Sequence, residues 1–347
     1  MQIGGRSISA GQPPFIIAEL SGNHGGSLQR ALETVDAVAE SGADALKLQT
    51  YTADTMTLDI DDDRFRVQDP GSLWAGRHLH DLYDEAHTPW EWHEAIFARA
   101  AERGLLAFSS PFDASAVDFL VSLGVPALKI ASFEITDLPL IRKAASTGLP
   151  LIVSTGMATW EEITAATQAA EEAGCEQLSL LWCTSAYPAP PEASNLAGIP
   201  DLRQRTGLEV GLSDHTLGTA VAVAAVALGA TIIEKHVTLD HELDTVDGEF
   251  SLSPEGMAQL VRDTHAAWSA VGEVAYGPSD AEIGSLRFRR GLYFVRDVPA
   301  GDVIDADAVR SLRPAAQLEP DAMDRVVGSE ARRAVRRGEP VTWDVLG

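Results

Sequence analysis

Short apolar runs rich in β-branched residues alternate with amphipathic stretches along most of the chain. In residues 28–42, for example, Leu28, Leu32 and Val35 recur at helical spacing, and Gly42 ends the pattern. We expect strands at 15–20, 45–50, 105–110, 127–132, 151–156, 178–183, 209–214 and 231–237. This alternation is typical of parallel strands joined by crossover helices.

Eight strand and helix units within about 250 residues fit a closed (β/α)8 TIM barrel better than an open doubly wound sheet. None of the expected strands is followed by the glycine-rich phosphate-binding pattern of dinucleotide or P-loop proteins, which weakens the open-sheet alternative. We therefore predict a barrel domain over residues 1–280. Residues 51–89 exceed an ordinary loop and are rich in aromatic and charged side chains, so they should form an excursion over one barrel face.

After residue 280 the strand and helix alternation stops. Short apolar segments separated by turns at Gly301 and Gly338 predict a second, β-rich domain over residues 284–347. Its basic cluster comprises Arg332, Arg333, Arg336 and Arg337. Pairing within or between subunits is our preferred interpretation of this cluster, and a binding patch is the alternative.

Every expected barrel strand turns polar at its carboxyl end, where the reactive groups of such barrels lie. The polar positions are Glu19, Lys47, Gln49, Ser109, Ser110, Lys129, Ser132, Ser154, Thr155, Cys183, Thr184, Ser213 to His215, Glu234 and His236. Because side chains alternate along a strand, Glu234 and His236 share one face of residues 231–237, and Lys235 lies on the other. We assign Glu234 and His236 to the barrel interior, which directs Lys235 outward toward the helices.

Two histidines, His215 and His236, stand on neighbouring strand ends, each beside a carboxylate, Asp214 and Glu234 respectively. Neutral imidazoles suit Mn, Zn, Co or Fe, and two of them leave coordination positions open for water and substrate. The alternative is that each is a hydrogen-bonded core histidine.

Lys47 and Lys129 are candidate anchors for a phosphate or carboxylate. A salt bridge to a barrel carboxylate such as Glu19 or Glu134 is a second interpretation. A third is a Schiff-base lysine, which needs a desolvated amine of lowered pKa. The residue pattern alone leaves these three open.

Composition limits the partners. The 347 residues include 51 acidic and 26 basic side chains, for a formal net charge of −25, which disfavours nucleic acid and anionic membranes. An anionic substrate would need a locally basic pocket. The two cysteines, the lack of a signal-peptide pattern and the lack of a membrane-length apolar segment lead us to expect a cytoplasmic protein.

The motifs at the strand ends resemble those of the sialic acid synthase family. The matching stretches are IIAELSGNHGGSLQRALE, LKLQTYTADTMTLD, FSSPFD, LKIASFEITDLPLI, STGMATWEEI, CTSAYPA, GLSDHT and EKHVTLD, in this order. LYFVRDVPAGDVI and SLRP are similar to the family's antifreeze-protein-like (SAF, β-clip) C-terminal domain. Residues 69–97, together with QTYTADTMTLD, are more similar to pseudaminic acid synthases than to N-acetylneuraminate or legionaminate synthases.

This resemblance implies a transferase that condenses phosphoenolpyruvate with 2,4-diacetamido-2,4,6-trideoxy-β-L-altropyranose, giving a nine-carbon 2-keto sugar acid and phosphate. It further implies a divalent cation (Mn, Mg or Co) held by His215 and His236, and a homodimer whose swapped C-terminal domains cap the neighbouring barrels. A Schiff-base aldolase and a non-catalytic sugar-binding barrel are the competing functions.

Site residues are carried over from the family by position. Glu19, Lys129 and Glu234 match catalytic positions, with Glu19 assisting proton transfer and Glu234 ordering water. Substrate contacts match Lys47, Gln49, Ser110, Ser132, Glu134, Ser154, Ser185, Tyr187, Ser213 and Asp247, and Arg313 matches an arginine that reaches the partner's site. The chain departs from the family pattern in HELDTVDGEFSL, in NHGGS and in the PAAQLEP that follows Arg313.

Overall fold

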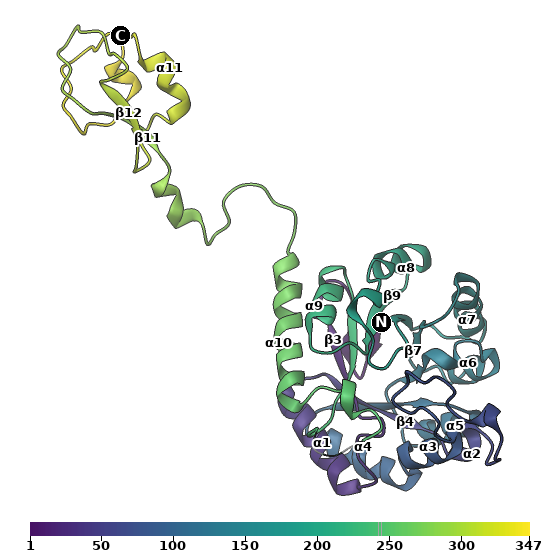
Figure 1. The fold of residues 1–347 in the computed structure, drawn as a ribbon. Helices are drawn as coiled ribbons and strands as arrows, with labels where there is room; N and C mark the ends of the chain where they lie inside the picture. The colour runs from purple at the N-terminus through teal and green to yellow at the C-terminus, as the bar shows by residue number, and fades with distance from the viewer. Residues whose placement is uncertain (242, 244) are drawn as a thin grey trace. The chain divides into compact units, whose positions relative to one another are not determined.

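In a computed structural model, which describes residues 1–241, 243 and 245–347, the chain forms two compact units (Figure 1). The first covers Met1–Gly272 and the second Glu273–Gly347. Glu242 and Asp244, within the divergent HELDTVDGEFSL stretch, lie outside the described residues. No helix among the described residues is long and apolar enough to cross a membrane.

The first unit is a closed barrel of eight parallel strands, as the sequence predicts. The strands are β3 (Phe15–Glu19), β4 (Ala45–Thr50), β5 (Leu106–Pro111), β6 (Leu128–Ile130), β7 (Leu151–Ser154), β8 (Leu178–Cys183), β9 (Glu209–Asp214) and β10 (Ile232–His236). Three of them, β4, β8 and β9, have the expected bounds. β6 is shorter than expected because the chain enters a 3-10 turn at Ser132–Glu134. β10 pairs with β3 and closes the barrel.

Helices cover the outside of the barrel (Figure 1). They are α1 (Leu28–Ser41), α4 (His93–Glu102), α5 (Ala114–Ser122), α6 (Leu138–Ala145), α7 (Trp160–Glu172), α8 (Gly198–Thr206), α9 (Ala220–Ala227) and α10 (Pro254–Val271). Local sequence sets their ends. In α1 the Ser27 side chain accepts a hydrogen bond from the Arg30 amide, and Gly42 ends the helix with φ 84°. A short hairpin of β1 (Gln2–Ile3) and β2 (Arg6–Ser7) precedes the barrel.

The excursion between β4 and α4 contains α2 (Ala53–Met56), α3 (Leu79–Ala86) and a 3-10 turn at Asp63–Phe65. Its Trp74 indole donates a hydrogen bond to the carbonyl of Val246, 3.1 Å away in the loop after β10. The excursion is thus tied to a loop at the carboxyl end of the barrel, which agrees with the prediction that it lies over one barrel face.

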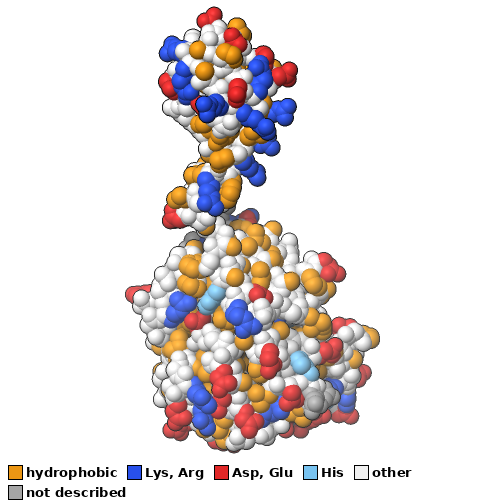
Figure 2. All heavy atoms as spheres, turned by 90° about the vertical axis from the view of Figure 1, so that its left-hand side faces the viewer, with side chains coloured by type: hydrophobic (Ala, Val, Ile, Leu, Met, Phe, Trp, Pro, Cys, Tyr) orange, Lys and Arg blue, Asp and Glu red, His pale blue; other side chains and the backbone are white. Residues whose placement is uncertain are grey.

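The second unit is β-rich, as expected. β11 (Gly291–Phe294) pairs antiparallel with β12 (Val309–Leu312), and α11 (Met323–Val326) follows. Leu292, Phe294 and other apolar side chains form its own core. Within the basic cluster, Arg333 pairs with Glu339 at 2.9 Å, so part of the cluster is used inside the unit. Figure 2 shows basic side chains at several places on the visible face of this unit.

Candidate active site

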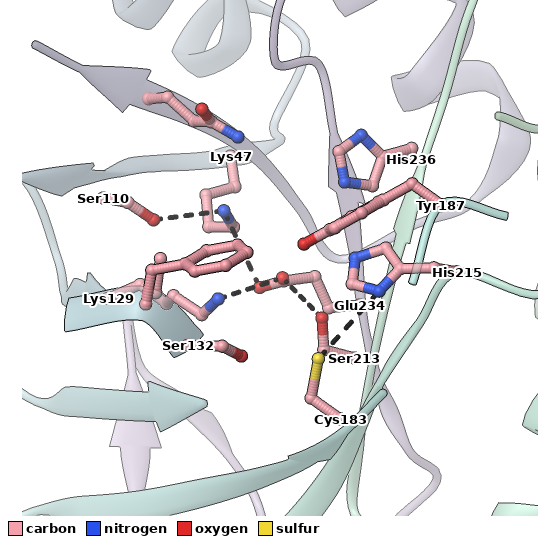
Figure 3. A pocket seen from close by; sticks show the side chains of 13 residues that line it. Lys47, Ser110, Lys129, Ser132, Cys183, Tyr187, Ser213, His215, Glu234 and His236 are labelled. Carbon is pink, nitrogen blue, oxygen red and sulfur yellow. Dashed lines mark hydrogen bonds and ion pairs between the residues drawn. The ribbon is translucent and has the colours of Figure 1, made fainter. Parts of the chain in front are cut away.

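A polar pocket lies at the carboxyl ends of the barrel strands (Figure 3). Its lining residues come from strands that are far apart in sequence and adjacent in the closed barrel. They are Lys47, Gln49, Ser110, Lys129, Ala131, Ser132, Phe133, Cys183, Tyr187, Ser213, His215, Glu234 and His236. The barrel therefore collects most of the strand-end residues that the sequence singled out.

The alternation of β10 decides which of its charges reach the pocket. Its apolar start, Ile232 and Ile233, is fully buried in the core. Glu234 lies opposite Ser213 of β9, and His236 lies opposite Glu19 of β3. Barrel closure thus places a carboxylate from the first barrel strand beside an imidazole from the last.

Two lysines and two glutamates form a buried ion-pair network in the pocket. Lys47 Nζ lies 2.5 Å from Glu19 Oε2 and 3.8 Å from Glu234 Oε2. Lys129 Nζ lies 3.2 Å from Glu234 Oε1. All four side chains are at most 5% exposed. Buried charges persist when they are paired and hydrogen-bonded, and two ammonium groups balance two carboxylates here.

Neutral side chains complete this network. The Ser213 hydroxyl donates to Glu234 Oε1 at 3.1 Å, and Lys47 donates to Ser110 Oγ at 3.1 Å. The Gln49 amide donates to Glu19 Oε1 at 3.1 Å. Figure 3 shows Lys129 and Ser213 directed at the same carboxylate. Lys47, Glu19 and Glu234 are therefore each held by more than one partner, and Lys129 is held by Glu234.

The two glutamates of the network titrate in opposite directions. Burial raises the pKa of Glu19, although the adjacent Lys47 opposes this. Burial would also raise the pKa of Glu234, but Lys129 and Lys47 together hold that pKa below its ordinary value. Glu19 is thus suited to carry a proton, and Glu234 to remain ionised.

The Lys47 ammonium is stabilised by its neighbours. Burial alone would lower the pKa of Lys47, but the carboxylates of Glu19 and Glu234 raise it overall. An amine that stays protonated is a poor nucleophile and a good anion anchor. This weighs against the Schiff-base interpretation at Lys47.

The imidazoles of His215 and His236 lie side by side, with ring centroids 5.4 Å apart. His215 Nδ1 lies 3.0 Å from the carbonyl oxygen of Thr184, which can only accept, so Nδ1 carries the proton and Nε2 keeps a free lone pair. His236 Nδ1 is buried and has no hydrogen-bond partner among the residues that the structure describes. Burial lowers the pKa of His236 well below its ordinary value, and the ammonium groups of Lys47 and Lys129 add to this, so the ring is neutral.

These two imidazoles fit a divalent cation. A neutral ring with an orphaned buried nitrogen, next to a ring whose tautomer is fixed by a carbonyl, is the donor set that a transition metal uses. In the described part of the chain no group of three or more His, Cys, Asp or Glu side chains is arranged to hold a metal. Water or substrate oxygens would have to complete the coordination.

Tyr187 and Asp247 lie beside the histidines. The Tyr187 ring packs against His215 with ring centroids 4.5 Å apart. Asp247 Oδ2 lies 3.8 Å from His236 Nδ1, and burial raises the pKa of Asp247. Both residues therefore lie where the sequence led us to expect substrate contacts.

Besides Glu19 and Asp247, three barrel residues of the expected set are not among the lining residues, although they end or follow the same strands: Ser154, Glu134 and Ser185. The Ser154 hydroxyl is buried without a hydrogen-bond partner in the described part of the chain, and the same holds for Glu134 Oε2. Burial raises the pKa of Glu134 to about 7, against the opposing charge of Lys129. Ser185 Oγ lies 3.9 Å from Cys183 Sγ. Arg313 belongs to the second unit.

Asp214 does not belong to the pocket. Although it stands next to His215 in the sequence, its carboxylate pairs with Lys235 at 2.8 Å. The register of β9 and β10 sets Asp214 opposite Lys235, so these two share a face that points away from the pocket. The alternation of β9, in which Ser213 faces inward, already contained this signal.

Sequence reasoning assigned no role to three pocket residues. Ala131 and Phe133 flank Ser132, and the Phe133 side chain is 60% exposed at the pocket mouth. Cys183 Sγ lies 3.9 Å from His215 Nδ1. Cys183 ends a predicted strand, which was an available signal, whereas an exposed phenylalanine after a strand carries none.

Comparisons with known proteins identify the family. A model of the NeuB family matches residues 34–276, and a model of the SAF domain matches residues 289–346. This chain belongs to the NeuB family. The resemblance found in the sequence is thereby confirmed.

Individual proteins that are similar to this chain include synthases of several nine-carbon sugar acids. The chain is 41% identical over 339 residues to the pseudaminic acid synthase of Campylobacter jejuni, covering 98% of each chain. It is 37% identical to the N,N'-diacetyllegionaminic acid synthase of Legionella pneumophila, over 95% of this chain and 94% of that protein. The crystal structure of the N-acetylneuraminic acid (sialic acid) synthetase from Leptospira borgpetersenii, in complex with citrate, has a TM-score of 0.73 at 31% identity, covering 82% of this chain and 94% of that one.

Proposed function

We propose that this chain is a pseudaminic acid synthase. It condenses phosphoenolpyruvate with 2,4-diacetamido-2,4,6-trideoxy-β-L-altropyranose and releases phosphate and a nine-carbon 2-keto sugar acid. The observation that carries the proposal is the match of nearly the whole chain to pseudaminic acid synthases at 40–41% identity, together with a pocket that combines lysines, carboxylates and two histidines.

Phosphoenolpyruvate binds at the basic side of the pocket in this proposal. Its carboxylate and phosphate take Lys47 and Lys129 as anchors, and the lining hydroxyls of Ser110, Ser132 and Ser213 supply hydrogen bonds. The buried Ser154 hydroxyl, which has no partner among the described residues, is a fourth proposed donor. Since both ammonium groups are already held by Glu19 and Glu234, they need little reordering when the anion arrives.

A divalent cation, Mn, Mg or Co, is held by His215 and His236 in this proposal. When bound, it supplies Lewis acidity toward the aldehyde oxygen of the open-chain sugar and toward water. Asp247, beside His236, together with Gln49, Glu134, Ser185 and Tyr187, forms the sugar end of the site.

Glu19 and Glu234 then assist the proton transfers of the reaction in this proposal. A C–C bond forms between C3 of phosphoenolpyruvate and the aldehyde carbon, and the aldehyde oxygen takes up a proton. Water adds to C2 with loss of a proton, and the C2–O bond to phosphate breaks. Glu19, whose pKa is raised by burial, is the proposed proton carrier. Glu234, held ionised by the two lysines, orders the attacking water.

Assembly and location complete the proposal. We propose a homodimer in which Arg313 of each C-terminal unit reaches the partner's pocket. The two cysteines, Cys175 and Cys183, are free and buried, which favours a reducing compartment, and we propose that the reaction runs in the cytoplasm.

Phosphate release from phosphoenolpyruvate tests the function. We expect release only with the acceptor sugar present, fastest with the pseudaminic acid precursor and slower with the corresponding sugars of legionaminate and N-acetylneuraminate synthesis. EDTA should abolish it and added Mn restore it. A preference for the legionaminate precursor would move the chain to that synthase, whose Legionella member is 37% identical. Full activity in EDTA would refute the metal assignment.

A further inference from the structure

A second buried ion pair lies behind the pocket, on the opposite face of β9 and β10. Lys235 Nζ lies 2.8 Å from Asp214 Oδ2, and their side chains are 0% and 1% exposed. Neither residue lines the pocket. Their neighbours in sequence are the two histidines, because His215 follows Asp214 and His236 follows Lys235.

The pair also fixes the turn that carries His215. The Lys235 ammonium also donates a hydrogen bond to the carbonyl of Thr216 at 2.5 Å. In the sequence, Asp214 precedes His215 and Thr216 follows it. Asp214 Oδ1 accepts hydrogen bonds from the Thr216 amide at 2.9 Å and from its hydroxyl at 2.8 Å. Residues 214–216 are therefore bound at both ends to one side chain of β10.

This link begins where the strand pairing stops. The register between β9 and β10 runs from Ile233 and Leu212 to its last pair, Lys235 and Asp214. His215 lies beyond that pair. The strand pairing between β9 and β10 therefore does not set the distance between His215 and His236. Among the described residues, the hydrogen-bonding contacts of His215 are also to residues outside β10: its ring Nδ1 donates to the Thr184 carbonyl and lies 3.9 Å from Cys183 Sγ, and its carbonyl accepts from the Ala189 amide.

A buried ion pair is weak support for stability, because desolvation offsets the attraction. Here the pair and its hydrogen bonds to Thr216 join residues 214–216 to β10. We propose that Lys235 and Asp214 are positioning residues that set the separation of the two histidine rings, and thereby the affinity of the site for a divalent cation. This inference rests on the proposed function only in the assignment of His215 and His236 as cation ligands.

The test is manganese binding without substrates, measured from the electron paramagnetic resonance signal of free Mn²⁺. The double variant Lys235→Met with Asp214→Asn removes both charges together, because removing one would leave an unpaired buried charge. The introduced amide would retain an acceptor oxygen for the Thr216 amide. A matched control is Arg203→Met with Glu209→Gln, which removes a 3.0 Å pair at the opposite end of β9.

We expect the double variant to fold and to bind Mn²⁺ about 10- to 100-fold more weakly than the wild type, the usual cost of removing an outer-shell partner. The control should bind like the wild type, and His236→Ala should lose binding. A folded double variant with wild-type affinity would overturn the inference, and so would one that fails to fold, since the pair would then be a core element. A wild-type protein that binds no Mn²⁺ would refute the metal assignment itself.

Discussion

Three glutamates at one rim show how surroundings separate residues of the same type. Burial raises the pKa of Glu19 and of Glu134, whereas Lys129 and Lys47 overcome burial and lower the pKa of Glu234. The sequence identified all three as site residues but did not rank their acidities. That ranking depends on how many lysines pair with each carboxylate, because Glu234 pairs with both Lys47 and Lys129 whereas Glu19 pairs with Lys47.

The titration of Glu134 has a consequence for stability. Its pKa rises from 4.5 to about 7, so the folded protein keeps a proton there that the unfolded chain has lost. The free energy of unfolding therefore falls as the pH rises through this window. We expect Glu134→Gln to show a smaller loss of thermal stability than the wild type between pH 4.5 and 7 in calorimetric scans. Parallel profiles would mean that Glu134 titrates outside this window.

At the scale of elements, aromatic contacts connect the excursion to the histidines. The ring centroids of Trp74 and Tyr187 lie 5.8 Å apart, and Tyr187 packs on His215. The indole hydrogen bond to Val246 joins the excursion to the loop after β10. An excursion held in this way borders the sugar end of the proposed site rather than its lysine end.

We expect Trp74→Ala to raise the KM for the acceptor sugar about 10-fold, because a lost aromatic contact of this kind is worth about 0.5–1.5 kcal/mol beyond its buried area. The KM for phosphoenolpyruvate should change little. Initial rates with each substrate varied in turn measure both constants. Leu73→Ala, at the 41% exposed neighbouring position, is the control. Equal changes in the two KM values would contradict a role specific to the sugar.

Some features of these elements could be predicted from the sequence, and others could not. Alternation and strand-end polarity located the eight strands and the inward faces of β4, β6 and β10, because each depends on neighbouring residues. The excursion could be recognised only by its length. The Trp74 hydrogen bond joins residues 172 positions apart, and no local pattern contains it. Asp214 stands next to His215 in the sequence, but alternation along β9 turns its carboxylate to the other face, where it pairs with Lys235.

At the scale of the whole molecule, the chain divides into a barrel with the pocket and a SAF domain that carries Arg313. In the proposed dimer, every working site combines a barrel from one chain with an arginine from the other. A variant with a damaged barrel still supplies an intact Arg313, and a variant without Arg313 still supplies an intact barrel. The two variants could therefore form one working site together.

We expect His236→Ala and Arg313→Ala to be nearly inactive alone and to recover activity when mixed under conditions that allow subunit exchange. Half of the dimers would be mixed, and one of the two sites in each would be intact, so recovery should approach about a quarter of the wild-type rate. Phosphate release measures it. A mixture that stays inactive despite proven exchange would show that Arg313 acts within its own chain.

The balanced charges of the pocket contrast with the formal net charge of −25, and Figure 2 shows acidic side chains scattered over the visible face of the barrel. A trianionic substrate must therefore diffuse through a repulsive field before it meets Lys47 and Lys129. Salt weakens that field, since the screening length falls from about 30 Å at 0.01 M to about 8 Å at 0.15 M. We expect kcat/KM for phosphoenolpyruvate to rise over this range while kcat/KM for the uncharged sugar stays constant. Such a protein would capture its anion faster in a saline medium than in dilute buffer.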